Sequence, residues 1–211
     1  MWMNRNSVRN GGMKKSSQQL VYKALEYLSK YQEGVREVTK PSLISPIHWS
    51  PPLLDKFKIN VDGAVFASQK TSRVGVLIKD SEGRVVGACS KKIQAPFGAV
   101  KAKAKAVEFG LQFAREMVIQ EFILEGDSLV LINALKEISP PPSSIATIVY
   151  GSLSTSHDFR QVEFSHVHWQ GNRPAHLLAK YVLGIDDFSV WIEESPCFLE
   201  QTLLNGVMIL P

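Results

Sequence analysis

The chain has 211 residues, of which 45% are hydrophobic and 21% charged, so it can bury the core of one ordinary α/β domain with appendages but not of two full domains. Its formal net charge of +4, from 24 basic and 20 acidic side chains, permits contact with a polyanion without establishing it. The sequence has no secretory signal and no stretch of about 18 apolar residues, which predicts an intracellular protein of the nucleus or cytoplasm, not secreted and with no membrane partner.

The first part of the chain is predicted to be separate from the main domain. In residues 1–39, apolar side chains recur at helical spacing between Gln18 and Gln32, with Ser17 as a candidate N-cap, which predicts an amphipathic helix. Residues 40–55 are rich in proline, which excludes a helix and predicts an extended linker.

The main domain is expected over residues 56–184. Phe57, Ile59 and Val61 alternate with polar residues, which predicts a strand with one buried face and with Asp62 at its end. The residues Asp80 to Gly83 then favour a hairpin turn between two further strands. The later elements are expected in this order: strands 73–79 and 84–92, helix 99–117, strand 121–125, helices 128–135 and 145–154, strand 161–168 and helix 173–183.

Three antiparallel strands followed by strands that alternate with helices predict an α/β fold with a mixed five-stranded sheet flanked by helices. The tail, residues 185–211, contains enough apolar side chains to pack on this domain, among them Trp191 and Phe198. The sequence therefore predicts one α/β domain, an N-terminal helical segment, a linker and a packed tail.

Two acidic motifs stand out: Val61-Asp62-Gly63-Ala64, and Glu125-Gly126-Asp127-Ser128 after the fourth strand. With the helix ending Phe109-Gly110-Leu111 and the motif Asn172-x-x-Ala175, they make residues 56–183 resemble the plant ribonuclease H-like domains related to the reverse transcriptases of non-LTR retroelements. The tryptophan- and proline-containing flanks also resemble that family, so the resemblance spans nearly the whole chain.

This resemblance implies a ribonuclease H-like fold and hydrolysis of the RNA strand of an RNA–DNA hybrid. In the family, four carboxylates hold two Mg²⁺ ions roughly 4 Å apart, one of which activates water while the other stabilises the leaving oxygen. The four are the Asp of the first strand, a Glu in the long helix, the Asp after the fourth strand and an Asp at the start of the last helix. This chain would use Mg²⁺ or Mn²⁺ if it is active.

Only half of this metal cage is present. The first and third carboxylates correspond to Asp62 and Asp127, whereas Lys103 occupies the second position and His176 the fourth. Helical spacing independently places Lys103 on the apolar face of the helix, toward the sheet. We therefore expect Lys103 to form an ion pair with Asp62, Asp127 or both, and metal binding by these two aspartates to be weak or lost.

Other polar residues near the motifs are secondary candidates. Gly63, Ser128 and Asn172 are candidate nucleic-acid contacts, and Asn172 is also expected to cap the last helix. Glu125 is a weak candidate for a substitute metal ligand. The remaining charged or imidazole side chains near the site, Lys101, Lys105, Glu108, His166 and His168, are expected to be ordinary helix or strand-edge residues.

Three functions remain open from the sequence. The domain is a nucleic-acid-binding module with impaired catalysis, a weak Mg²⁺- or Mn²⁺-dependent ribonuclease of RNA–DNA hybrids, or a retroelement-derived structural or partner-binding domain. Phosphate contacts need positive charge but no metal cage, which favours the first of these over the second.

Overall fold

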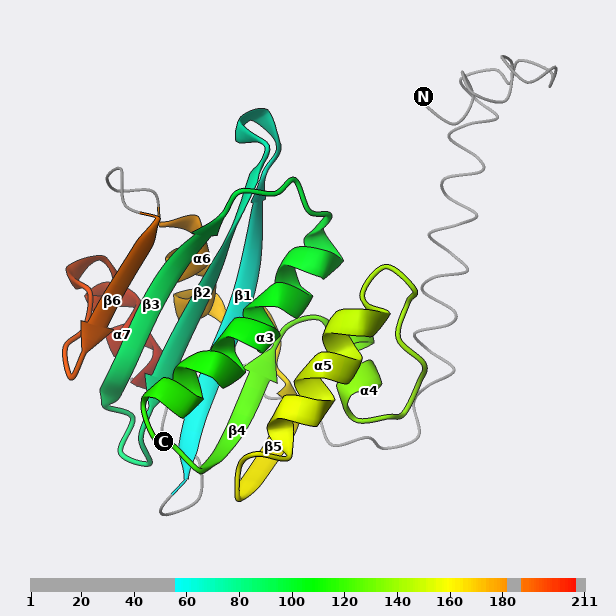
Figure 1. Ribbon diagram of the computed structural model, residues 1–211. Helices are drawn as coiled ribbons and strands as arrows, with labels where there is room; N and C mark the ends of the chain where they lie inside the picture. Colours follow the sequence, from blue (N-terminus) through cyan, green and yellow to red (C-terminus); the bar gives the residue numbers. More distant parts are fainter. Residues whose placement is uncertain (1–55, 182–186, 208–211) are drawn as a thin grey trace, which may run out of the picture. The chain divides into compact units, whose positions relative to one another are not determined.

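The computed structural model describes residues 56–181 and 187–207; the expected N-terminal helix and linker lie outside these residues. Up to residue 180, the strands and α-helices follow each other in the expected order (Figure 1). They are β1 (Phe57–Phe66), η1 (Ala67–Gln69), β2 (Thr71–Lys79), β3 (Val85–Ile93), α3 (Ala99–Glu116), β4 (Glu121–Gly126), α4 (Leu129–Leu135), α5 (Ala146–Ser156), β5 (Gln161–His166), α6 (Arg173–Lys180), β6 (Phe188–Ile192), η2 (Cys197–Leu199) and α7 (Glu200–Val207).

The strands form one mixed sheet in the order β5-β4-β1-β2-β3-β6. The central strand β1 pairs antiparallel with β2 and parallel with β4, and β4 pairs parallel with β5. In Figure 1, α3 lies across one face of the sheet and α6 lies behind the other face. This arrangement confirms the expected α/β class, with three antiparallel strands followed by strands that alternate with helices.

The sheet has six strands in the described part of the chain, so the expected number of five was too small. The additional strand, β6, comes from the tail and pairs antiparallel with β3 from Gly87 to Lys91. Trp191 of β6 contacts the rings of Tyr181 and Phe198. The apolar residues of the tail therefore extend the sheet as well as pack on it.

The prediction that β1 ends at Asp62 was wrong, because the strand continues to Phe66. Its pairing with β2 runs from Lys58 to Phe66, which holds the strand extended past Asp62. Its pairing with β4, in contrast, stops at Asn60 opposite Glu125. Asp62 thus lies within β1, just beyond the point where the neighbouring parallel strand leaves it.

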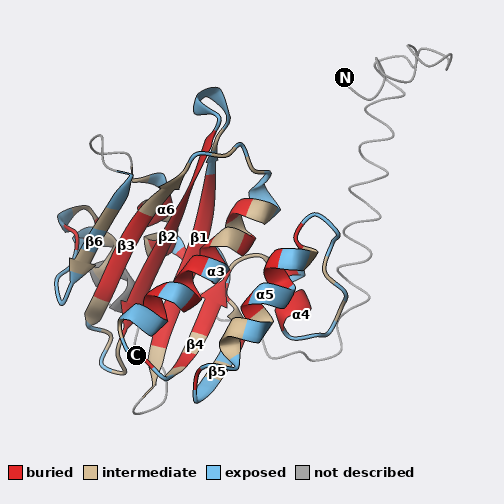
Figure 2. Cartoon of the chain, in the orientation of Figure 1, coloured by how far each residue is buried: buried red, intermediate tan, exposed pale blue. Residues whose placement is uncertain are grey.

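The prediction that only one face of β1 is buried was also wrong (Figure 2). Lys58, Asn60 and Asp62 are 4%, 1% and 1% exposed, and Ile59 and Val61 on the other face are equally buried. Two layers of helices cause this: α3 packs on the apolar face of β1 and α6 on the polar face. Central strands of such sheets are buried on both sides.

One close backbone contact sets the position of α3 on the sheet. A Cβ atom at Gly63 would lie 2.3 Å from the carbonyl carbon of Ala102 and 2.7 Å from the nitrogen of Lys103. Only glycine allows the helix backbone to approach β1 this closely.

None of the described helices combines the length and the apolar character that crossing a bilayer requires.

Candidate functional site

The candidate site lies where the parallel strands β1 and β4 separate. Asp62 projects from β1 on the face that α6 covers, and Asp127 follows directly after the last residue of β4, Gly126. The carboxyl ends of adjacent parallel strands meet at one edge of a sheet, and ligands often bind there. The fold therefore brings together the two aspartates that are 65 residues apart in the sequence.

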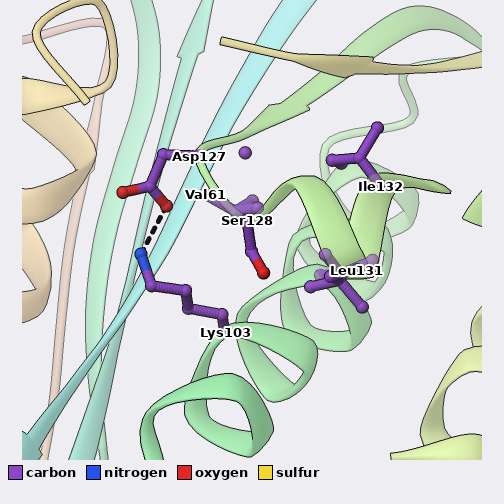
Figure 3. A pocket seen from close by; sticks show the side chains of 8 residues that line it. Val61, Lys103, Asp127, Ser128, Leu131 and Ile132 are labelled. Carbon is purple, nitrogen blue, oxygen red and sulfur yellow. Dashed lines mark hydrogen bonds and ion pairs between the residues drawn. The ribbon is translucent and has the colours of Figure 1, made fainter. Parts of the chain in front are cut away.

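Lys103 of α3 reaches both aspartates. Its Nζ donates to Asp62 Oδ1 at 2.8 Å and to Asp127 Oδ1. Figure 3 shows the lysine side chain extending from its helix to the Asp127 carboxylate. Burial works against the charge of the ammonium, but the two carboxylates more than compensate and hold the pKa of Lys103 above its usual value. Of the alternatives expected for Lys103, an ion pair with Asp62, with Asp127 or with both, the structure has the last.

His176 completes the contacts of Asp62. Its Nδ1 lies 2.7 Å from Asp62 Oδ2, from the first turns of α6, so both oxygens of this buried carboxylate have a partner. The Asp62 side chain is 1% exposed, whereas that of His176 is 43% exposed. All four positions that the family resemblance singled out therefore converge on one cluster, which we call the Lys103 cluster: Asp62, Lys103, Asp127 and His176.

Three residues were expected to touch nucleic acid, and burial argues against two of them. Gly63 is buried under α3, and its role is the close approach of Ala102 described above. Asn172 is 1% exposed. Ser128 is partly exposed at the N-cap position of α4, and it alone of the three remains open to a ligand.

Asn172 also differs from the expectation that its side chain caps α6. It occupies the N-cap position, but its side chain makes no capping hydrogen bond. Its Nδ2 donates to the Val61 carbonyl at 3.0 Å, and its Oδ1 accepts from Asn60 Nδ2 at 3.3 Å. The side chain therefore ties the start of α6 to β1 next to Asp62, which places His176 one helical turn later within reach of that aspartate.

A buried polar layer beside the Lys103 cluster was missed from the sequence. Both oxygens of Glu125, the candidate substitute ligand, are engaged elsewhere: its Oε1 pairs with Lys58 at 3.0 Å, and its Oε2 accepts from Asn60 at 2.9 Å. Lys79 faces Lys58 across the β1–β2 pair, and burial lowers its pKa to about 8, although Glu125 opposes this shift. The sequence feature that could have indicated this layer is the polar alternation Lys58-x-Asn60-x-Asp62, for which exposure to solvent was predicted.

The donor set of the Lys103 cluster does not fit two Mg²⁺ ions. Mg²⁺ requires oxygen ligands in near-octahedral geometry, whereas a lysine ammonium has three donors and no acceptor. Lys103 already contacts the inner oxygens of both aspartates. The hollow beside it, lined by apolar residues such as Val61 and Leu131, has a volume of about 10 Å³, which is space for one water at most. The ammonium therefore already contacts the two carboxylates on which a cation would depend.

The other histidine and lysine side chains near the site do not belong to the Lys103 cluster. The rings of His166 and His168 pack edge to face at 5.8 Å, and burial lowers the pKa of His166. Over residues 56–181 and 187–207, no three His, Cys, Asp or Glu side chains gather as a metal ion would require. Lys105 pairs with Glu108 at 2.5 Å, and Lys101 lies over the Phe97 ring.

Comparison with known proteins agrees with this fold. Residues 60–182 match the family model described as "Reverse transcriptase-like". An Arabidopsis thaliana protein whose name assigns it provisionally to ribonuclease H is 30% identical over 176 residues. That match covers 80% of this chain but only 28% of the plant protein.

Solved structures of ribonucleases H share the fold. Ribonuclease H1 of the archaeon Halobacterium salinarum superposes with a TM-score of 0.56 at 19% identity and covers 59% of this chain and 95% of its own. LC11-RNase H1 in complex with an RNA/DNA hybrid gives a TM-score of 0.54 at 17% identity, with 59% and 94% coverage. At these identities the likeness establishes the ribonuclease H-like fold and no more.

Proposed function

The chain belongs to the reverse transcriptase-like family, and from this premise we propose that its ribonuclease H-like domain binds nucleic acid, as an RNA–DNA hybrid or another duplex, without efficiently cleaving it. One observation carries the proposal: the Lys103 ammonium bridges Asp62 and Asp127, the two carboxylates that correspond to metal ligands in the family. In this proposal the four side chains stand at the positions of the family's carboxylates, and the Lys103 ammonium supplies positive charge in place of metal ions.

Simple electrostatics supports the loss of metal binding. Four carboxylates would offset the charge of two divalent ions, whereas Asp62, Asp127, Lys103 and a neutral His176 together carry a charge of −1. At an effective dielectric constant of about 20, two unit charges 4 Å apart interact by roughly 4 kcal/mol. Reversing one charge and neutralising another should therefore weaken Mg²⁺ binding by several powers of ten, and catalysis with it.

Nucleic-acid binding does not depend on this metal cage. Phosphate contacts supply most of the affinity of such proteins and require only basic side chains and backbone amides. LC11-RNase H1, which shares the fold, was solved with an RNA/DNA hybrid, and the A. thaliana relative has a ribonuclease H name. These likenesses support an RNA–DNA hybrid as the first ligand to test.

A cleavage assay tests the catalytic half of the proposal. The full chain is incubated with an end-labelled RNA–DNA hybrid in Mg²⁺ and, separately, in Mn²⁺, with an active ribonuclease H as the positive control. We expect no cleavage above background. Robust cleavage that disappears in the Asp62→Asn variant would show instead that the domain is a metal-dependent ribonuclease despite Lys103.

A binding series tests the other half. We expect the affinity of the full chain for the hybrid to fall steeply between about 50 and 200 mM salt, because phosphate contacts release bound counterions. EDTA should leave this affinity unchanged, since no metal bridges the protein to the ligand. A chain that binds neither hybrid, duplex DNA nor duplex RNA at low salt would be a structural or partner-binding domain, and the proposal would be wrong.

A further inference from the structure

A groove runs between α3 and the end of β3, on the side of α3 away from β4. Its volume is about 380 Å³, within the range of small-ligand sites. Strand β3 forms one wall and the middle of α3 the other, as the neighbouring positions of these elements in Figure 1 illustrate. The polar and charged lining residues are Lys91, Lys92, Gln94, Lys105, Glu108 and Gln112.

The groove has an excess of positive charge, although basic and acidic side chains are nearly equal in number in this part of the chain. Residues 45–211 contain 16 basic and 17 acidic side chains, yet three lysines and one glutamate line this groove. A concave surface with an excess of one sign of charge attracts ligands of the opposite sign. The ligand should therefore be an anion.

The lysines are held in place by their neighbours. Lys91 Nζ lies 4.7 Å from the centre of the Phe109 ring, which forms part of the groove. Lys105 is held at 2.5 Å by Glu108, and Lys92 at 3.2 Å by Asp187, which is 64% exposed. Ammonium groups that are already positioned lose less side-chain entropy when an anion binds.

We propose that this groove binds a phosphate-bearing nucleotide unit of a nucleic-acid strand. Lys91 and Lys105, one from each wall, contact the phosphate, and the side-chain amides of Gln94 and Gln112 offer donors and acceptors to the sugar and base. The proposal rests on the proposed function, because it names the place where the bound strand lies. It adds a contact region that uses β3 and the outer side of α3.

The groove and the Lys103 cluster are separate sites on the same helix. Lys103 and Lys105 are two residues apart, which on an α-helix corresponds to a rotation of about 200°. Lys103 therefore points toward β1 and Asp127, while Lys105 points toward β3. Since the two sites share no side chain, substitutions in the groove leave the ion pairs of Asp62 intact.

An acidic peptide is the competing ligand, and the lining favours the nucleotide. The glutamine amides match the mixed donors and acceptors of a nucleotide. A peptide of glutamates serves as the probe for this alternative.

The experiment compares two double variants of the full chain by fluorescence anisotropy. Lys91→Gln with Lys105→Gln removes one lysine from each wall; Lys136→Gln with Lys180→Gln removes two exposed lysines elsewhere and serves as the matched control. The probes are a labelled single strand and an RNA–DNA hybrid, over a range of salt concentrations. Circular dichroism and thermal unfolding establish that each variant is folded.

We expect the groove variant to bind both probes about tenfold more weakly and to lose roughly 0.7–0.9 units of the salt slope, since the two lysines share one phosphate and each phosphate contact contributes about that much. The control variant should show less than a third of these losses in affinity and salt slope. Equal losses in both variants, or tighter binding of the glutamate peptide than of the oligonucleotides, would overturn the proposal. If the wild-type chain binds and the groove variant binds equally well, only this inference fails; if the wild-type chain does not bind, the proposed function fails as well.

Discussion

Lys103 Nζ lies 2.8 Å from Asp62 Oδ1, so an ammonium neutralises the aspartate that the resemblance matches to the first metal ligand of ribonucleases H. Asp62 is 1% exposed, and a carboxylate buried to this degree requires a compensating positive charge. Lys103 supplies this positive charge to Asp62. This relationship leads to direct tests of stability and metal binding.

The first prediction concerns the loss of the ammonium. Replacing Lys103 by methionine keeps the length of the side chain but leaves Asp62 buried without its counter-charge. Removing one partner of a buried pair costs about 3–5 kcal/mol, and we expect the free energy of unfolding in urea to fall by roughly 3 kcal/mol. Lys101→Met, at a partly exposed position of the same helix, should change it by less than about 0.5 kcal/mol. Equal effects of the two substitutions would show that the ion pair contributes little.

The second prediction restores the carboxylates. In the double variant Lys103→Glu, His176→Asp, four carboxylates surround the place of the ammonium, and we expect Mg²⁺ to bind with a measurable heat in calorimetry. Mg²⁺ at ten times its dissociation constant should then stabilise the fold by about 1.4 kcal/mol. The wild-type chain should show neither effect. A double variant that is folded but binds no Mg²⁺ would mean that these four positions do not form a metal cage.

The third prediction uses the buried Lys79. Its pKa is about 8 in the fold and 10.5 in the unfolded chain, so between these values the unfolded chain holds more protons. Stability should therefore rise with pH across this window, by up to about 3 kcal/mol from this group. The measurement is urea unfolding of wild type and Lys79→Met at several pH values from 7 to 10. The wild type should gain stability relative to the variant as pH rises; a constant difference would contradict the shift.

The fourth prediction concerns the glycine that follows Asp62. A methyl group at Gly63 would overlap the backbone of Ala102, so Gly63→Ala must push α3 away from β1. We expect a loss of at least about 3 kcal/mol and a weakened Lys103–Asp62 contact. Gly151→Ala is the control, because nothing lies within 4 Å of its Cβ and it is within α5; this change should stabilise the chain by about 0.5–1 kcal/mol. If Gly63→Ala were as stable as wild type, the close approach would not be essential.

Much of the fold could be predicted from local patterns. The periods of apolar residues indicated the order of the elements from β1 to α6, and apart from the ends of β1 and α6 each begins and ends within two residues of its expected bounds. Helical spacing alone placed Lys103 on the inner face of α3. These features depend on residues that are close together in the sequence, so the local periodicity of apolar residues indicates them.

The tertiary structure alone decided which polar residues are buried together. Asn60, Glu125 and Asn172 are separated by as many as 112 residues, and no local pattern indicates that they hydrogen-bond. The sixth strand and the burial of the polar face of β1 likewise depend on which segments pack against the sheet. The sequence by itself determined the α/β class and predicted that Lys103 and His176 stand at two carboxylate positions. Only the packing of α3 and α6 around β1 determined that these two residues share one buried aspartate, because that contact requires three distant segments to meet.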